Sequence, residues 1–369
     1  MTTEKVSLDL SELQKIEVLG LPFGYKSTKN EEGTTNIVLL PFPNEVDGFN
    51  SGLKKFSSET LMLLRSKHYF GINIRSQMLD VLYDTFIEKY ELKEKSPNDY
   101  LTLQAIYSEM IIKLGTIVED FAGICYACKE YQVNGSDIAQ VFLAYSDPTS
   151  FYKSIISKTG KRKIKQIFGL PQSKGDLNKI FRDLTEIETE LLMKAIESSV
   201  NLIQQEFCNV SKTIIRKTKD NVTYYDMYNK LKHGFSPIYP FVIPYPLTAV
   251  ASSNDFKIEE LITEHLFENI TIMHDKLPGQ RTTEEQKRYK DEKLATPAFA
   301  AEYINLDTAK NIKEQVVRIT SIYQYLINKY LLISKGDTTL HLFLSKDLVG
   351  HEENKKIKLI ISDKSRYKI

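Results

Sequence analysis

The sequence predicts a mainly α-helical bundle, on three observations. Apolar residues recur every three or four positions over residues 100–131 and 179–216, and again from Asp307 onward. Capping signals such as Ser96-Pro97 mark where helices begin. Only short β-branched runs, near the two ends of the chain, are typical of strands. We therefore expect long antiparallel helices, an irregular N-terminal arm and a small C-terminal β-hairpin.

Composition limits the classes of function. The 369 residues admit two domains or one enlarged core. The 49 basic and 48 acidic side chains leave a formal charge of +1, so affinity for nucleic acid would have to come from a local patch. No stretch approaches the roughly 20 apolar residues of a membrane span, and residues 1–7 lack the pattern of a secretory signal. We expect a cytoplasmic protein without a membrane partner.

The cysteines predict neither a disulfide framework nor a metal site. There are three in the chain, too few for a disulfide scaffold in a chain of this length. Cys125 and Cys128 form a Cys-x-x-Cys, but they lie inside an apolar helical repeat with no second pair. We predict that both are reduced and buried, that no metal is bound, and that no cofactor is needed.

The N-terminal part divides into an arm and the start of a bundle. Residues 1–55 carry turn-forming clusters around the β-branched run 36–40, which predicts one or two strands in a covering segment. Helical spacing begins at Ser57 and opens a bundle that we place at residues 56–235, with Gly71 as a break between two helices.

The helix at 100–131 has the clearest apolar stripe. Its members step by three or four residues and are Leu103, Tyr107, Met110, Leu114, Ile117, Phe121, Ile124 and Cys128. Glu119 and Asp120 lie on its polar side, and adjacent positions do not share a helix face. A paired acid–base site within this helix is therefore not expected. Each carboxylate is predicted to be solvated, or to meet a basic side chain from a neighbouring helix.

A basic segment follows the turn 134–137 and a predicted helix at 138–156. It spans residues 158–165 and holds five cations, namely Lys158, Lys161, Arg162, Lys163 and Lys165. Such a cluster can contact phosphates, with an affinity that falls as salt rises. The alternative is a solvated loop between helices.

The C-terminal part, residues 236–369, is expected to be mixed. Residues 236–246 hold four prolines and predict an extended segment. A weak helix near 258–267 and a charged linker at 279–293 follow. A closing helix at 307–333 then precedes a β-rich tail. In that tail the runs 338–344 and 357–361 are spaced for a hairpin.

The polar helix predicted after the helix at 179–216 concentrates the residues capable of chemistry. Thr223 and Asp226 have the spacing of a capping box, and Gly234 is placed to end the helix. Asp226, Asn229, Lys230 and His233 fall at spacings of three, four and seven, so we expect one face to present them together. The alternative is that His233 caps the terminal carbonyls and the lysines are solvated.

With these residues in hand, the chain resembles the HEPN superfamily of helical domains. The resemblance rests on Tyr228-Asn-Lys-Leu-Lys-His-Gly234 after two long helices, and covers roughly residues 57–234. It implies an HEPN-like bundle. Many such domains are metal-independent ribonucleases of toxin–antitoxin and antiviral systems, with active sites that combine the motifs of two domains across a dimer.

The chain departs from the family motif where that motif has an arginine. Tyr228 stands there, and no arginine occurs between Arg216 and Arg281. For a ribonuclease, the resemblance assigns His233 as general acid or base and Asn229 as an orienting donor. Lys230 or Lys232 would then be the cation facing the phosphate, although lysine lacks the planar fork of arginine.

Three functions remain open from the sequence. The first is a non-catalytic HEPN-like module, in a bacterial defence or toxin–antitoxin setting, that binds RNA, a nucleotide or a protein partner. The second is a metal-independent endoribonuclease, active as a homodimer. The third is an unrelated helical scaffold in which Tyr228 to Gly234 only ends a helix.

Overall fold

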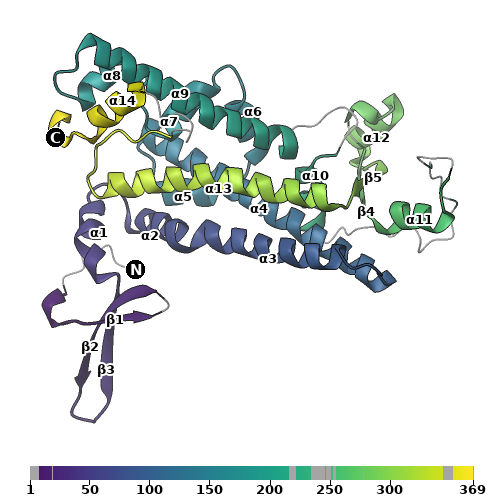
Figure 1. Cartoon of the computed structure of the whole chain (residues 1–369), viewed down its shortest axis with the longest axis horizontal. Helices are drawn as coiled ribbons and strands as arrows, with labels where there is room; N and C mark the ends of the chain where they lie inside the picture. Colours follow the sequence, from purple (N-terminus) through teal and green to yellow (C-terminus); the bar gives the residue numbers. More distant parts are fainter. Residues whose placement is uncertain are drawn as a thin grey trace.

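The computed structural model describes residues 8–18, 20–215, 222–233, 246, 251, 255–276, 278–343 and 352–368. The described chain is mainly helical, as predicted, with small antiparallel sheets (Figure 1). Its helices are α1 (Val46–Gly52), α2 (Ser58–Ser66), α3 (Ile72–Tyr90), α4 (Pro97–Asn134), α5 (Ile138–Ala144), α6 (Pro148–Ile155), α7 (Gly160–Ile167), α8 (Lys174–Ile180), α9 (Glu186–Val210), α10 (Tyr224–Leu231), α11 (Ile258–Ile262), α12 (Thr283–Glu292), α13 (Leu306–Ser334) and α14 (Glu352–Ser362).

Helix α4 is the axis of the bundle. It packs against α3 and α13 on one side and against α5, α7 and α10 on the others. Ser96 caps its start in a capping box with Asp99, and Gly135, with φ 68°, ends it as a left-handed residue. The apolar stripe predicted from the sequence is buried along its length. The predicted helix at 100–131 is thus confirmed and extends about one turn further at each end.

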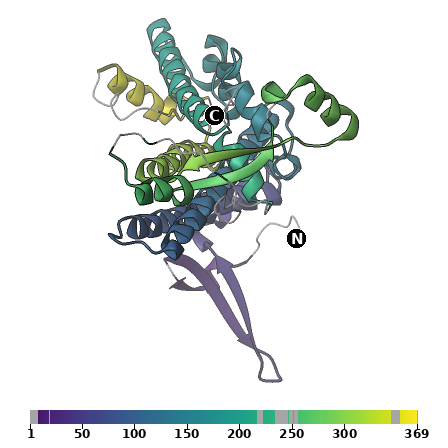
Figure 2. The same ribbon diagram turned by 90° about the vertical axis from the view of Figure 1, so that its right-hand side faces the viewer.

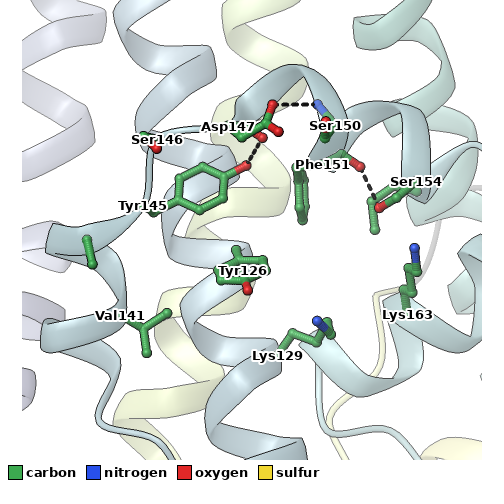
Figure 3. Close-up of a pocket in the computed structure, with 12 residues that line it drawn as sticks. Tyr126, Lys129, Val141, Tyr145, Ser146, Asp147, Ser150, Phe151, Ser154 and Lys163 are labelled. Atoms are coloured by element: carbon green, nitrogen blue, oxygen red, sulfur yellow. Dashed lines mark hydrogen bonds between the residues drawn. The ribbon is translucent and has the colours of Figure 1, made fainter.

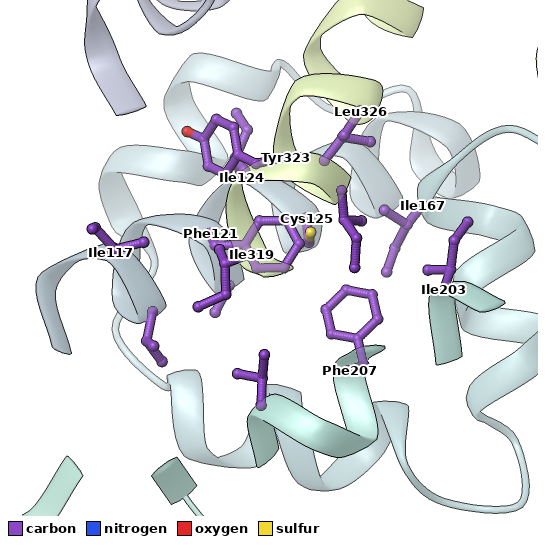
Figure 4. Close-up of a cluster of buried hydrophobic side chains, with 14 of the residues drawn as sticks. Ile117, Phe121, Ile124, Cys125, Ile167, Ile203, Phe207, Ile319, Tyr323 and Leu326 are labelled. Atoms are coloured by element: carbon purple, nitrogen blue, oxygen red, sulfur yellow. The ribbon is translucent and has the colours of Figure 1, made fainter. Parts of the chain in front are cut away.

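The core lies where α4, α9 and α13 meet. Phe121 of α4 stacks on Phe207 of α9 with ring centres 5.3 Å apart, and Tyr323 of α13 lies beside Phe121 (Figure 4). Helix α13 therefore closes the bundle, as expected for residues 307–333. Phe121 and Phe207 join the two helices that we predicted to be the longest, but α9 packs mainly on α7, α13 and α14, and α13, with 29 residues, is longer than α9, with 25.

Cys125 and Cys128 lie in this core. Both are free and fully buried, and burial raises the pKa of each thiol above its ordinary value. The predicted burial is confirmed. The absence of a metal stays a prediction, which analysis of the purified protein for zinc would test.

The helix predicted at 179–216 is divided in the structure. Helix α8 ends at Ile180, and α9 begins only after Thr185, which caps it in a capping box with Glu188. Asp183, with φ 49°, lies in the left-handed region between them, so the helical phase restarts. As a result Leu192 and Ile196 are buried, whereas Ile187, which falls on the apolar spacing of residues 179–216, is 80% exposed.

Three further boundaries differ from the sequence prediction. The helix expected at 138–156 is broken into α5 and α6, because Asp147 caps a new helix whose first residue is Pro148. The charged linker expected at 279–293 contains α12, which begins at a capping box formed by Thr282 and Glu285. Gly71 lies at the end of a π-helical turn that joins α2 to α3, so the expected break is a local distortion.

The N-terminal arm is more regular than expected. It forms a three-stranded antiparallel sheet of β1 (Gln14–Val18), β2 (Leu21–Lys29) and β3 (Thr35–Pro41). Gly33, with φ 81°, supplies the left-handed residue of the turn between β2 and β3. The sheet projects away from the helices (Figures 1 and 2). Its exposed apolar side chains are Ile16, Val18, Ile37, Val38 and Leu39.

The small antiparallel sheet expected toward the C-terminus is present, but its strands are β4 (Asn269–Asp275) and β5 (Pro297–Tyr303). The two runs from which we predicted it are not its strands. Residues 338–343 have no regular structure, and 357–361 lie in α14. Ile357 and Ile360 are both buried at a spacing of three, which suits a helix.

Among the residues that the structure describes, no helix is both long enough and apolar enough to cross a membrane. The proline-rich segment 236–246 falls outside the described residues except for Pro246.

Candidate functional site

Helix α10 carries the polar segment singled out from the sequence. The Thr223 hydroxyl accepts from the Asp226 amide at 3.2 Å, and the Asp226 carboxylate accepts from the Thr223 amide at 3.1 Å. The predicted capping box is therefore present. Met227, Tyr228 and Leu231 are buried and hold α10 on α4. Gly234, expected to end the helix, lies outside the described residues.

Tyr228, at the position of the family arginine, has a structural role. Its ring is 4% exposed and lies over Gly115 of α4, where a Cβ atom would come within 2.1 Å of the ring. Its hydroxyl donates to Glu119 at 2.7 Å. The Tyr225 hydroxyl donates to the same carboxylate at 2.8 Å, and the Lys232 ammonium lies 3.1 Å from it. This buried face fastens α10 to the bundle.

The charge of Glu119 fits this role. Burial alone would raise the pKa of its carboxyl, but the hydrogen bonds from Tyr228, Tyr225 and Lys232 bring the pKa below its ordinary value. The carboxylate therefore stays ionised between its donors.

Asp120, the next residue along α4, meets different partners. It pairs with Lys67 and with Arg75, the latter at 3.0 Å, and accepts from the Tyr323 hydroxyl at 2.7 Å. Its side chain is 9% exposed. The two carboxylates thus do not form an acid–base pair within α4, and both meet basic side chains of other elements.

Two of the three predicted catalytic residues line one cleft. Asn229 and Lys230 line a cleft of about 370 Å³ against β4 and α12. His233 is exposed and is not among the residues that line this cleft. The reason is the early end of α10 at Leu231 with Lys232 as its cap, so the helical spacing does not continue to His233. The cleft thus brings together Asn229 and Lys230 but not His233.

The basic segment is a helix and not a loop. Residues 160–167 form α7, and Lys165 is 8% exposed and pairs with Glu197 of α9. Lys232 pairs with Glu119. Lys165 and Lys232, both predicted to bind nucleic acid, thus form ion pairs within the protein. The other four are Lys158, Lys161 and Arg162, which are exposed, and Lys163, which is half-buried.

Lys163 borders a groove that the sequence did not predict (Figure 3). We call it the aromatic groove. It has a volume of about 590 Å³ and is lined by Tyr126, Lys129, Val141, Ala144, Tyr145, Ser146, Asp147, Ser150, Phe151, Ser154, Ile155 and Lys163.

The aromatic groove combines rings with cations. The rings of Tyr126 and Tyr145 have centres 5.0 Å apart, and Phe151 points into the same space (Figure 3). The Lys129 ammonium lies 4.9 Å from the centre of the Tyr126 ring. Lys163 has no hydrogen-bond or ion-pair partner among the residues that the structure describes. Its ammonium is available to a ligand.

The break between α5 and α6 opens this groove. Tyr145 leaves the helix there, and its hydroxyl donates to the Asp147 carbonyl at 2.5 Å. The sequence signal was Asp147-Pro148, a capping residue followed by a proline, which a single helix over 138–156 overlooks.

Comparison of the chain with protein-family models, with curated proteins and with solved structures gives no match. The resemblance to the HEPN superfamily therefore stays a prediction. Within the described ranges, no three histidine, cysteine, aspartate or glutamate side chains gather as metal ligands.

Proposed function

We propose that this protein is an HEPN-like module that binds single-stranded RNA in the aromatic groove and does not cleave it. The observation that carries the proposal is the arrangement of Tyr126, Tyr145 and Phe151 beside the Lys163 ammonium in one concavity. Unpaired bases stack on aromatic side chains, each worth about 1–3 kcal/mol, while basic side chains track the phosphates.

The surface next to the groove extends the positive charge. Lys163 borders the groove from α7, and Lys161 and Arg162 on the same helix are exposed. Lys158 precedes that helix and is also exposed. None of these four makes an ion pair with another residue in the described part of the chain. A strand whose bases enter the groove would therefore find cations for the neighbouring phosphates.

Binding without cleavage is favoured by the motif on α10. Cleavage at phosphorus needs a general acid or base beside a fixed cation. Tyr228 replaces the family arginine and is bound to Glu119, and Lys232 is bound to the same carboxylate. Asn229 and Lys230 face a cleft that His233 does not line. The ribonuclease alternative would need a second copy to bring a cation to His233.

Charge reversal on α7 tests the binding proposal. For the Lys161→Glu/Lys163→Glu variant we expect at least about a tenfold weaker affinity for a short labelled single-stranded RNA at low salt. We also expect the slope of log affinity against log salt to flatten by about 1.4, or about 0.7 for each lost phosphate contact. Fluorescence anisotropy across a salt series measures both.

Two controls separate the alternatives. Lys54→Glu/Lys55→Glu changes the net charge equally at two exposed lysines between α1 and α2, and should leave RNA affinity nearly unchanged. Gel analysis of the incubated RNA should show intact RNA with wild type and with His233→Ala. RNA cut by wild type and spared by His233→Ala would establish the ribonuclease instead, and equal loss in both charge variants would leave only non-specific attraction.

A further inference from the structure

The cleft beside α10 is separate from the aromatic groove and shares no lining residue with it. It lies where α10, β4 and α12 come together at one end of the molecule (Figure 1). It is lined by Val222, Asp226, Asn229, Lys230, His274, Asp275, Lys276, Arg281, Gln286 and Tyr289. The proposed RNA binding uses none of these residues.

Arg281 is a buried cation with an unused donor. Its side chain is 4% exposed, pairs with Asp275 through one terminal nitrogen, and lies 3.9 Å from the centre of the Tyr289 ring. Its Nε is buried and has no hydrogen-bond partner. A buried donor without an acceptor is unfavourable by about 1–3 kcal/mol, and by more when the group is charged. An acceptor in the cleft would relieve this cost.

Further donors face the same space. Lys230 and Asn229 line the cleft, and neither has a hydrogen-bond or ion-pair partner among the residues that the structure describes. His274 is 9% exposed, and its Nδ1 lies 2.8 Å from the Asp275 carbonyl. A carbonyl only accepts, so Nδ1 carries the proton, and Nε2 of the neutral ring is left as an acceptor for a ligand.

The carboxylates of the cleft are already engaged. Asp275 pairs with Arg281 and accepts from the Thr296 amide at 2.9 Å. Asp226 belongs to the capping box of α10. Lys276 pairs with Glu285 at 3.1 Å. The unsatisfied capacity is therefore the charge of Lys230 and the Nε donor of Arg281, with the Asn229 amide beside them.

One acceptor in the cleft also lacks a partner. Gln286 Oε1 is buried and makes no hydrogen bond. A ligand that satisfies the whole cleft must therefore present an anion to Lys230 and Arg281, and a hydroxyl or amino donor to Gln286. Sulfate or chloride supplies the first but lacks the second.

We propose that this cleft binds a phosphate monoester carried on a hydroxyl-bearing group, such as a nucleoside monophosphate. The phosphate oxygens accept from Arg281 Nε, the Lys230 ammonium and the Asn229 amide, and a sugar hydroxyl donates to Gln286 Oε1. Phosphate paired with arginine and lysine forms charge-assisted hydrogen bonds, the stronger kind in proteins. The same chemistry occurs on a free mononucleotide and on the 5′ end of an RNA.

Titration calorimetry of the full chain with AMP, inorganic phosphate and adenosine tests the proposal. AMP should bind more tightly than inorganic phosphate, and adenosine should bind at least about tenfold more weakly than AMP because it lacks the anion. An affinity for adenosine equal to that for AMP, or no binding of AMP, would overturn the assignment.

Variants at Lys230 locate the site without disturbing the fold, since Lys230 makes no ion pair with a described residue. Lys230→Glu should weaken the affinity for AMP by at least about tenfold, and Lys230→Arg should retain AMP binding. Lys310→Glu, an exposed lysine on α13, is the matched control. Equal AMP affinity in wild type and Lys230→Glu contradicts the proposal, provided that their melting temperatures agree.

RNA oligonucleotides with a 5′-phosphate or a 5′-hydroxyl distinguish the two sources of the phosphate monoester, a free mononucleotide and an RNA end. A preference for the 5′-phosphate that Lys230→Glu removes assigns the cleft to an RNA end, whereas AMP binding without that preference assigns it to a free mononucleotide. Either outcome supports a phosphate monoester. The Lys161→Glu/Lys163→Glu variant should retain AMP binding, so failure of the RNA proposal would not be mistaken for failure of this one.

Discussion

Asp120→Ala is expected to lower the free energy of unfolding by about 3–5 kcal/mol. The carboxylate is 9% exposed and neutralises Lys67, whose side chain is 10% exposed, while also binding Arg75. Its removal leaves a buried ammonium without a counterion and the Tyr323 hydroxyl without its acceptor. Chemical denaturation of the purified variant measures the change.

Two further variants show whether the loss comes from the unpaired charge. Asp84→Ala removes an exposed carboxylate on α3 and should change stability by no more than about 0.5 kcal/mol. Asp120→Leu/Lys67→Met removes both charges and should recover a large part of the loss, because no ammonium is then buried alone. An Asp120→Ala protein as stable as the Asp84→Ala control would contradict this account.

Gly115→Ala is the second substitution for which we expect a large change in the free energy of unfolding. In an exposed helix interior, alanine in place of glycine would stabilise by about 0.5–1 kcal/mol. Here the new methyl group would meet the Tyr228 ring at 2.1 Å, so we expect destabilisation by about 1–3 kcal/mol. Chemical denaturation supplies the value.

The double variant Gly115→Ala/Tyr228→Ala identifies the contact. With the ring removed the methyl group has room, so the two substitutions together should cost less than the sum of their separate effects. Strict additivity would mean that Tyr228 does not rest on Gly115. Circular dichroism of each variant checks that the helical bundle persists.

The long helices were predictable because local signals agree with the packing. For α4, the capping box at Ser96 and an unbroken apolar stripe specify the same helix. Helix α13 was placed to within a turn for the same reason, since Asn305 caps it and its stripe is buried.

Short interruptions limited the prediction of α9 and of the aromatic groove. A single left-handed residue, Asp183, restarts the helical phase while leaving an apolar spacing that still suits one long helix. Asp147 restarts the helical phase between α5 and α6 by capping a new helix, and that break opens the groove. The spacing of apolar residues alone cannot detect such breaks, because the apolar residues on both sides of a break still recur about every three or four positions.

The sequence predicted only part of the cleft beside α10. Asn229 and Lys230 were found from their helical spacing, but His274 and Arg281 lie about fifty residues later, on β4 and before α12. The alternation of Ile270, Ile272 and His274 on the buried face of β4 was the available signal. Their meeting with α10 depends on tertiary packing, which no local pattern specifies.

Photo-cross-linking with RNA that carries thiouridine, followed by mapping of the modified peptides, tests the central claim most directly. We predict intact RNA with cross-links on Tyr126, Tyr145 or Phe151, and their loss when Lys161→Glu/Lys163→Glu abolishes binding. Cross-links concentrated around His233, or RNA shortened during the incubation, would contradict an RNA-binding groove that does not cleave.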